Sequence, residues 1–519
     1  MSTVPVKVKH NGKVYDIELD TQAQGRAFKE AIAAQTHVPP ERQKVMVKGG
    51  LLKVRARALT QDDTDLGKIG ARAVRHTLTQ GQQFMVLGAA GELPQAPAKP
   101  VQFLEDMPED EVAQAARHRI GLVNLGNTCY LNSTLQMLRC IPELDAALDA
   151  YAGSVSAGGD ASLTASLRDL FREMNKAPHA FPPLLFLTIL RKVAPQFAET
   201  AQGGGFAQQD AEEAYVRILN ALGAYLGSGE ERFVPAYLTG HMAIERSCPE
   251  APEEPKTHNR EPFLVLQCNI SSTTNDMTAG ILDTLTQRIE KHSETLGRTA
   301  AYTEESRLAR LPAYLSVHFV RFYWRRDINK CTKIMRKVKF PLELDASAFA
   351  TADLQQRVAP LSHKVKAVAK EREDRAKVRR RARGRGTDAK RDEDAAPHQE
   401  GSAITDDDER ALRAKERAEI EALIDPTLKS DAGCNASGLY DLAAVVTHKG
   451  AAADAGHYMS WVRCENASND EFDTLPSNEW YQFNDDKVSV VNSEKIASLY
   501  GGGEDSVAYL LLYRARSLQ

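Results

Sequence analysis

Residues 121–138 read GLVNLGNTCYLNSTLQML, and this stretch carries the clearest structural and chemical signal in the chain. Gly126-Asn127-Thr128 is typical of a tight turn, and the leucines that follow recur at helical spacing at 131, 135 and 138. The sequence therefore predicts that Cys129 lies on the first turn of a buried helix. The helix dipole and the unpaired backbone N–H groups at such a position favour the thiolate, which is the form of cysteine that attacks carbonyl groups.

The same pattern also fits a buried cysteine that begins a core helix and has no chemical role, which is the commoner situation for an isolated cysteine. Asn124 and Asn127 favour the chemical interpretation, because their side-chain amides can donate hydrogen bonds to a developing oxyanion. Nucleophilic catalysis by Cys129 also requires a base.

A candidate base lies in residues 440–462, YDLAAVVTHKGAAADAGHYMSWV. Alternating apolar residues predict two strands joined by a loop of small residues, with His457 at the start of the second strand. Imidazole is the general base best matched to neutral pH, and a cysteine protease needs one beside its thiol. His457 stands in a Gly-His-Tyr triplet with Gly456 and Tyr458, whereas His448 is typical of an ordinary core or surface histidine.

The segment that follows this histidine, residues 480–486, reads WYQFNDD. Asn484 can accept a hydrogen bond from the Nδ1–H of His457 and so fix the tautomer of the imidazole. An amide lends no charge to an imidazolium ion, so the neighbouring Asp485 remains an alternative partner. By itself, such an Asn-Asp-Asp run is typical of an ordinary turn.

A pair of carboxylates stands in residues 208–213, QQDAEE, at the start of a predicted helix. On a helical wheel Asp210 and Glu213 lie on one side, away from the buried apolar stripe. Two acids in this arrangement usually form a solvated face and nothing more. The alternative is that they pair with arginines of a partner.

The cysteine, histidine and asparagine segments resemble the corresponding boxes of the ubiquitin-specific proteases, a family of papain-like deubiquitinases. The resemblance implies that Cys129 is the nucleophile, that His457 is the general base and acid, and that Asn484 orients it, with Asp485 as a substitute. It further implies that the side chain of Asn124 and the backbone N–H of Cys129 stabilise the oxyanion.

The QQDxxE motif extends this resemblance to substrate binding. In the family it faces the ubiquitin tail, which carries arginines just before its two C-terminal glycines. The substrate-binding residues that the resemblance implies are Gln209, Asp210, Glu213, Gly456 and Tyr458.

Three weaker matches, at residues 311–322, 337–341 and 506–513, resemble strands of the same catalytic domain. The implied fold class is α+β, with a helical thumb, a mixed-sheet palm and antiparallel-sheet fingers over residues 115–519. The family branch that this chain resembles lacks zinc-ribbon cysteines, and we expect neither a metal nor a cofactor.

Residues 1–91 read as a separate small domain. Val4, Val6 and Val8 alternate with polar residues, and Asn11-Gly12 predicts a type I′ hairpin turn. A helix containing Phe28 and two further strands near 45–47 and 83–86 complete a pattern that resembles a β-grasp ubiquitin-like domain. Because the chain continues past Gly91, this domain has no free C-terminal Gly-Gly, so we expect it to dock on a partner or to act only as a stabilising appendage.

Residues 92–114 are rich in Pro and Ala and predict a mobile linker. Residues 352–431 are densely charged, with few large apolar residues between 367 and 403, so we expect a solvated, disordered insertion in the catalytic domain. The stretch RRRARGR within it is a weak signal for nuclear import or nucleic-acid binding.

The composition fits a globular chain of two or three domains: 519 residues, 42% hydrophobic and 26% charged. The net charge of −4 favours neither nucleic acid nor an anionic membrane as a partner. Seven scattered cysteines without a CxxC pair indicate a reducing compartment and offer no structural zinc site. With no signal-peptide or membrane-spanning pattern, we expect a monomer in the cytosol and also in the nucleus.

The sequence thus predicts a thiol-dependent deubiquitinase that hydrolyses the isopeptide bond after the C-terminal glycine of ubiquitin. The combination with an N-terminal ubiquitin-like domain resembles the proteasome-associated branch of the family. That branch implies docking on the proteasome regulatory particle and loops near 325–336 and 449–456 that cover the cleft of the free enzyme. The alternatives are a ubiquitin-binding scaffold with weak or no catalysis, and a protease for another ubiquitin-like modifier.

Overall fold

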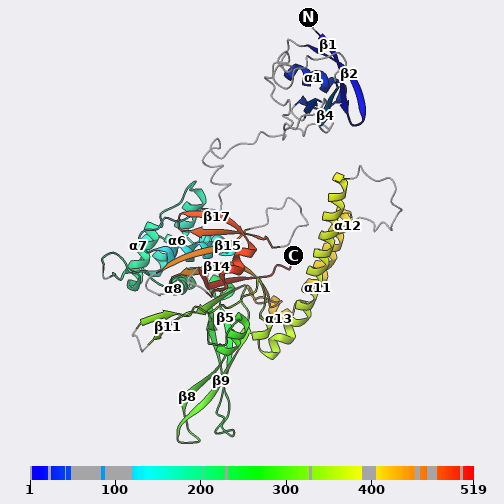
Figure 1. Ribbon diagram of the computed structural model, residues 1–519. Helices are drawn as coiled ribbons and strands as arrows, with labels where there is room; N and C mark the ends of the chain where they lie inside the picture. The colour runs from blue at the N-terminus through cyan, green and yellow to red at the C-terminus, as the bar shows by residue number, and fades with distance from the viewer. Residues whose placement is uncertain are drawn as a thin grey trace. The chain divides into compact units, whose positions relative to one another are not determined.

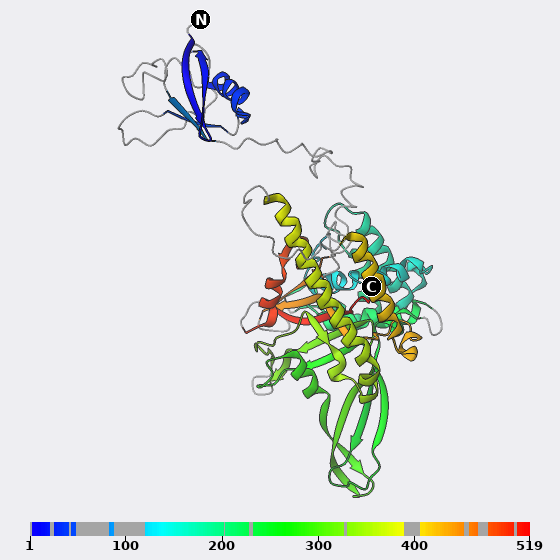
Figure 2. The same cartoon turned by 90° about the vertical axis from the view of Figure 1, so that its right-hand side faces the viewer.

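The computed structural model describes residues 3–20, 25–40, 43–47, 83–87, 120–201, 203–227, 232–325, 330–388, 405–450, 456–464, 476–502 and 506–518. The chain divides into two compact units, 1–106 and 107–519 (Figures 1 and 2). The expected linker at 92–114 and the boundaries at 91 and 115 lie outside the described residues and stay predictions.

The first unit has the predicted β-grasp order. Its elements are β1 (Thr3–His10), β2 (Lys13–Asp20), α1 (Gly25–Thr36), β3 (Lys44–Val47) and β4 (Gln83–Leu87). The sheet order is β2-β1-β4-β3, with β1 and β4 parallel and the other pairs antiparallel. Asn11 and Gly12 have φ of 45° and 81°, as a type I′ hairpin requires. The helix packs Phe28 against Phe84 in the core, which confirms the ubiquitin-like fold.

The second unit is built around a central mixed sheet of order β17-β16-β15-β14-β18-β10-β7, with β13 added to β14. Only β10 and β7 run parallel; the other pairs are antiparallel. The strands are β7 (Val265–Asn269), β10 (Tyr314–Val320), β13 (Glu343–Asp345), β14 (Leu439–Lys449), β15 (His457–Arg463), β16 (Glu479–Asn484), β17 (Lys487–Asn492) and β18 (Val507–Ala515). The expected strands at 311–322 and 506–513 are β10 and β18, whereas residues 337–341 form only an isolated bridge at Lys339.

Both faces of the central sheet are buried. On β14, Ala444 and Val446 belong to the core shared with the helices, whereas Val445 points into a second core on the opposite face. The helical side consists of α4 (Cys129–Arg139), α5 (Pro142–Ala150), α6 (Gly159–Lys176), α7 (Leu184–Val193), α8 (Ala211–Tyr225) and α9 (Phe233–Tyr237). The elements beside the second core include α10 (Met277–Thr284) and α14 (Ser493–Ala497). These two layers are the expected thumb and palm.

A four-stranded antiparallel sheet of order β6-β5-β9-β8 extends from the palm and forms the expected fingers (Figure 1). Its strands are β5 (Gly240–Ser247), β6 (Thr257–Phe263), β8 (Thr286–Ser293) and β9 (Arg298–Arg310). A separate hairpin, β11 (Phe322–Arg325) and β12 (Lys330–Lys333), follows β10 directly.

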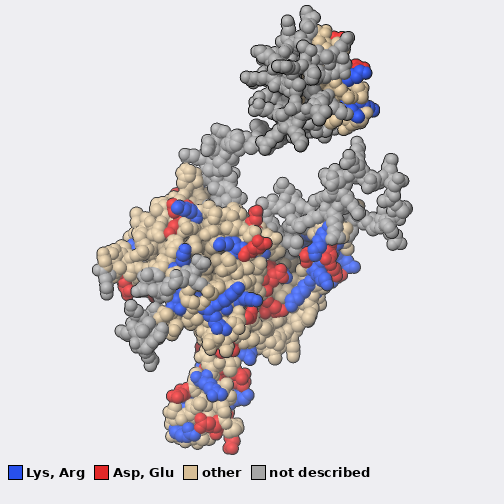
Figure 3. Space-filling model, in the orientation of Figure 1, with Lys and Arg blue, Asp and Glu red and all other residues tan. Residues whose placement is uncertain are grey.

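The charged segment at 352–431 differs from the disordered insertion that the sequence predicted. Its described parts form α11 (Ala352–Asp388), α12 (Asp406–Ala422) and α13 (Pro426–Lys429), with residues 389–404 outside the description. Lys, Arg, Asp and Glu intermingle over the two long helices (Figure 3). Glu409, whose side chain is fully buried, pairs with Arg375 at 2.9 Å and with Arg413 at 2.8 Å. Ion pairs across the helices, such as Arg375–Glu409, therefore add to a small apolar cluster in which Leu361, Val365 and Val368 of α11 pack with Ile420 of α12.

Within the described part of the chain, no helix has the length and apolar character needed to cross a membrane.

Candidate active site

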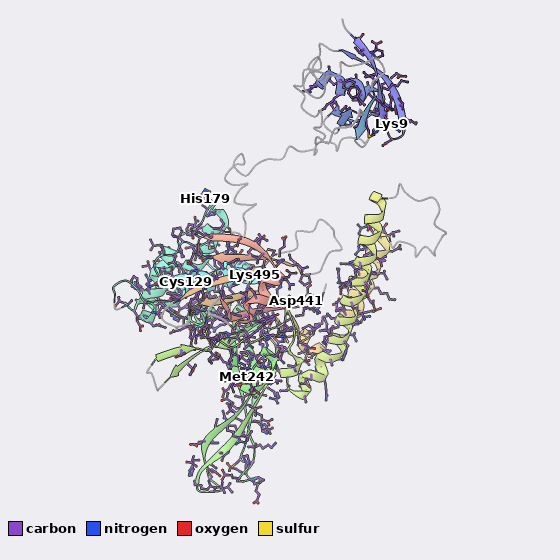
Figure 4. All side chains as sticks on the ribbon, viewed as in Figure 1. Lys9, Cys129, His179, Met242, Asp441 and Lys495 are labelled. Carbon is purple, nitrogen blue, oxygen red and sulfur yellow. The ribbon has the colours of Figure 1, made fainter. Side chains whose placement is uncertain are left out.

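Cys129 is the first residue of α4, as predicted, at the junction of the helical layer and the central sheet (Figure 4). Thr128 is the N-cap, and the two residues before it take positive φ, 93° at Gly126 and 54° at Asn127. This turn brings the chain sharply into the helix, so that the thiol stands at the helix N-terminus. The side chain of Asn127 donates to the carbonyl oxygen of Phe206 at 3.0 Å and thus holds a neighbouring loop.

The thiol of Cys129 is 3% exposed, and burial raises its pKa above the usual value. Backbone N–H groups of Tyr458, Tyr130 and Cys129 itself act in the opposite direction, and the negative charge of Asp485 adds to the increase of the pKa. The backbone N–H groups at the helix N-terminus thus favour the thiolate, as expected, but burial of the sulfur has the larger effect on the pKa. At neutral pH the group is a thiol, so the attack needs a base that removes its proton.

His457 supplies an imidazole beside this thiol. It is the first residue of β15, and the backbone N–H of the next residue, Tyr458, is one of the groups that contact the sulfur. The His457 Nε2 lies 2.6 Å from Oδ1 of Asn484, the last residue of β16. An amide oxygen only accepts hydrogen bonds, so Nε2 carries the proton and Nδ1 is the basic nitrogen. The expectation that Asn484 binds Nδ1–H is therefore wrong about the nitrogen, although the pairing itself is as predicted.

Asp485 has a different set of partners and does not act as the substitute for Asn484 in this structure. Its Oδ2 accepts from Nδ2 of Asn124 at 2.9 Å, and its Oδ1 accepts from Nδ2 of Asn132 at 2.8 Å. Its carbonyl oxygen also accepts from the N–H of Leu122 at 2.9 Å. Asp485 thus ties the turn after β16 to both the loop and the helix that flank Cys129.

Asn124 is exposed, and both its amide oxygen and its amide nitrogen make hydrogen bonds within the chain. Its Oδ1 accepts from the N–H of Gly126 at 2.9 Å and from the N–H of Thr128 at 3.3 Å, while Nδ2 donates to Asp485. An amide nitrogen has two hydrogens, so Nδ2 can make one further hydrogen bond. A held amide donor beside a nucleophile is the arrangement that an oxyanion hole needs.

Asp210 is not on the helix, as the helical wheel assumed, but is its N-cap. Its Oδ1 accepts from the N–H groups of Glu212 at 2.7 Å and Glu213 at 3.3 Å. Its Oδ2 accepts from the hydroxyl of Tyr509. Both oxygens of this half-buried carboxylate therefore have partners within the chain, and the exposed Glu213 is the freer of the two acids for a cationic partner.

Glu212, which sequence reasoning left aside, has the most perturbed carboxyl group of this region. Burial, followed by the negative charge of Asp210, raises the pKa of Glu212 to about 7. The side chain of Gln267 bonds to it and acts in the opposite direction. Nothing in the spacing of the motif distinguishes this residue, because its burial depends on packing against β7.

The remaining substrate-binding candidates fall into two groups. Gly456 is exposed, and its N–H donates to Oε1 of Gln208 at 3.0 Å, so the histidine loop contacts the segment that also holds the half-buried Gln209. Tyr458 is 1% exposed, and its ring packs against those of His448 and Tyr509. Its side chain belongs to the core and offers no surface to a substrate; only its backbone reaches the site.

Two further residues of the site escaped sequence reasoning. Asn132 was read as part of a helix defined by its leucines, yet its amide joins α4 to Asp485; a polar residue at a 2% exposed helical position is the signal that could have identified it. Gln208 was recognised only as part of its motif, although it holds the backbone of Gly456. Among the described residues, no cluster of three His, Cys, Asp or Glu side chains could hold a metal ion.

Comparisons with known proteins agree with this arrangement. The family model described as "Ubiquitin carboxyl-terminal hydrolase" matches residues 120–513, and that of the "Ubiquitin family" matches residues 4–62. The chain is 40% identical over 518 residues to "Ubiquitin carboxyl-terminal hydrolase 6" of Schizosaccharomyces pombe, covering 99% of each chain. It is 36% identical to "Ubiquitin carboxyl-terminal hydrolase 7" of Arabidopsis thaliana, covering 98% of each chain.

A third relative is "Ubiquitin carboxyl-terminal hydrolase 14" of Caenorhabditis elegans, which is 30% identical over 99% of this chain and 94% of its own length. The matched family segment contains every residue of the site built above, from Cys129 to Asp485. The chain therefore belongs to the ubiquitin carboxyl-terminal hydrolase family, as a cysteine-type ubiquitinyl hydrolase that carries an N-terminal ubiquitin-like domain.

Proposed function

We propose that this hydrolase cuts the isopeptide bond after the C-terminal glycine of ubiquitin on conjugates, and that it does so at the proteasome, where it recycles ubiquitin and trims chains. The observations that carry the chemistry are the hydrogen bond between His457 and Asn484 and the contact of the Cys129 sulfur with the backbone N–H of Tyr458, the residue that follows His457. The location at the proteasome is supported by the N-terminal ubiquitin-like domain, whose fold suits docking.

In this proposal Nδ1 of His457 takes the proton of the Cys129 thiol as the sulfur attacks the glycine carbonyl carbon. The oxyanion accepts hydrogen bonds from Nδ2 of Asn124 and the backbone N–H of Cys129. The C–N bond then breaks, and the lysine amine leaves with the proton from His457, so that ubiquitin remains as a thioester on Cys129. A water molecule gives a proton to Nδ1 and attacks the thioester, and the C–S bond breaks. Nδ1 returns this proton to the sulfur, and the ubiquitin acid leaves as a carboxylate after losing its own proton to solvent.

The proposal predicts the effect of changing the partner of the imidazole. Asn484→Ala should lower kcat/KM on a ubiquitin substrate by roughly 10²-fold, within the range that general acid–base catalysis contributes. The reason is that Nε2 loses its acceptor and Nδ1 is no longer kept unprotonated. Asn484→Asp keeps an acceptor oxygen and should retain most of the activity. Equal activity of Asn484→Ala and the unmodified chain in steady-state assays would remove Asn484 from this role.

Ubiquitin is the favoured substrate over another ubiquitin-like modifier because Asp210 and the exposed Glu213 offer carboxylates that can pair with the arginines of its tail. Electrophilic derivatives of ubiquitin and of a modifier without tail arginines test this preference. The proposal expects faster capture of ubiquitin, with the difference reduced by Glu213→Gln. Equal capture rates would favour a protease that also acts on other ubiquitin-like modifiers.

Docking gives a separate prediction. A chain lacking residues 1–91 should hydrolyse a small ubiquitin substrate at the rate of the full chain, because the two units are compact on their own. It should no longer co-sediment with purified proteasome regulatory particles, whereas the full chain should. Undiminished co-sedimentation of the shortened chain would contradict docking through the ubiquitin-like domain.

The proposal places a monomeric enzyme in the cytoplasm and the nucleus. Support comes from the described part of the chain, where Cys129, Cys140, Cys248, Cys268 and Cys434 form no disulfide, as in a reducing compartment. Fractionation of cells that express the full chain tests the location, and recovery only in a secretory fraction would contradict it.

A further inference from the structure

Lys333, the last residue of β12, is a buried cation in an unusual environment. It is 4% exposed, and its ammonium donates to Nδ1 of His448 at 3.1 Å, to the carbonyl oxygen of His448 at 2.8 Å and to that of Gly450 at 2.9 Å. Among the described residues, these partners include no carboxylate. Removing an ammonium from water without an opposite charge costs free energy. The burial of Lys333 therefore lowers the stability of the folded chain.

His448, which accepts a hydrogen bond from this ammonium, lies against the residues that flank the catalytic histidine. It is fully buried, between the rings of Phe322 at 5.2 Å and Tyr458 at 4.7 Å. A Cβ built on Gly456 would lie 2.3 Å from Nε2 of His448 and 2.4 Å from the carbonyl oxygen of Lys449. The backbone of Gly456 therefore rests directly against the His448 ring.

These contacts hold both ends of the segment that leads into His457. At the start, Lys333 binds the carbonyl oxygen of Gly450; at the end, Gly456 rests on the His448 ring and donates to Gln208. His457 follows at once and pairs with Lys449 across the two strands. A shift of His448 is thus transmitted to the backbone that sets the direction of the imidazole.

We propose that Lys333 is a positioning residue for hydrolysis: by holding His448 and Gly450, it fixes the backbone from which His457 reaches the Cys129 thiol. The inference rests on the chemistry proposed above and concerns how that geometry is maintained. Lys333 lies in the hairpin that follows β10, so it joins this hairpin to the histidine loop. It has no contact with Cys129 or His457 and acts only through its neighbours.

The test separates positioning from substrate binding. Lys333→Met, which keeps length and apolar volume but removes the ammonium, should lower kcat on a ubiquitin substrate by about 10- to 100-fold, the range expected for a misplaced catalytic group. KM should stay within about two-fold, because the Lys333 side chain is buried. Lys333→Gln retains a donor for one carbonyl oxygen and should lose less. The control is Lys339→Met, which removes an exposed lysine from the following segment and should leave kcat unchanged.

Several outcomes would overturn the inference. One is unchanged kcat in Lys333→Met and Lys333→Gln; another is a change confined to KM; a third is an equal loss of kcat in Lys339→Met.

If the Lys333 variants fail to fold, ¹⁵N NMR of the histidines in the unmodified chain provides the test. Burial, and then the charges of Lys333 and His457, lower the pKa of His448 to about 3, so its ring should stay neutral at pH 5 with its proton on Nε2.

A His448 ring that titrates near its ordinary pKa, or that carries its proton on Nδ1, would contradict the contact with Lys333. The failure of the proposed function would look different from either result. In that case the unmodified chain itself would neither hydrolyse ubiquitin substrates nor react with electrophilic ubiquitin, whereas the present inference fails only against an active unmodified chain.

Discussion

Cys129→Ala should reduce hydrolysis of a ubiquitin substrate by on the order of 10⁴- to 10⁶-fold, as loss of the nucleophile does in other enzymes with a catalytic triad. The sulfur forms the thioester in the proposed mechanism, and no other side chain of the site can replace it. A fluorogenic ubiquitin substrate, assayed with and without a thiol-alkylating reagent, measures the effect. Residual turnover within 100-fold of the unmodified chain would contradict the role of Cys129.

The matched control is Cys140→Ala, at the other end of α4. Cys140 is half-buried, and its position as the C-cap places it a full helix length from Cys129. This variant should keep the unmodified rate. Cys129→Ala should still bind ubiquitin, because the substitution removes only one buried atom and leaves the surface around Glu213 intact. Loss of ubiquitin binding in Cys129→Ala would mean that the substitution disturbs the fold and not only the chemistry.

Asn124→Ala should lower kcat by about 10²- to 10³-fold with little change in KM, the usual effect of losing one oxyanion-hole donor. The amide nitrogen has one hydrogen committed to Asp485, which leaves the other for the oxyanion. Steady-state kinetics on ubiquitin with a fluorogenic leaving group provides the measurement. Turnover equal to that of the unmodified chain would remove Asn124 from the oxyanion hole.

Asp485→Ala gives a comparison that distinguishes the two neighbouring residues. If Asp485 acts by holding Asn124, this variant should lower kcat as Asn124→Ala does, and the double variant should be no worse than either single one. If Asp485 instead replaced Asn484 as the partner of the imidazole, the effects of Asp485→Ala and Asn124→Ala would multiply. Multiplying effects would contradict the hydrogen bonds described here.

The local features of this site were predictable because they depend on short segments of chain. The turn before Cys129 needs positive φ, which Gly126 and Asn127 provide, and the leucines of α4 mark its buried face. His457 and Asn484 stand at the ends of strands whose apolar alternation is visible in the sequence. The β-grasp unit was predictable for the same reason, from its hairpin turn and the alternation in β1.

Other features depend on contacts between distant segments, which spacing does not reveal. The choice of Nε2 for Asn484 follows from how β15 and β16 pair, and the partners of Asp485 lie more than 300 residues before it. The burial of Tyr458 could not be predicted from its triplet, because the rings that bury it come from β14 and β18. The pKa of Cys129 likewise depends on burial by the assembled cleft.

The helices at 352–388 and 406–422 show how composition alone can mislead. A segment with few large apolar residues cannot form an ordinary core, yet here Glu409 and Glu416 pair with arginines of α11. Low apolar content does not exclude order, because paired charges join the two helices beyond the small apolar cluster of Leu361, Val365, Val368 and Ile420. The complementary signs were present in the sequence, but which charges meet is decided only when the two helices lie side by side.

The most direct test of the account is covalent capture of the full chain by ubiquitin whose C-terminus bears an electrophile. The account predicts one adduct, which mass spectrometry of the digested protein maps to Cys129, and a large fall in its rate of formation in His457→Ala. Cys129→Ala should bind this probe without forming an adduct. Adduct formation on another cysteine, or binding by the unmodified chain without any adduct, would contradict the claim that Cys129 and His457 together form the catalytic centre.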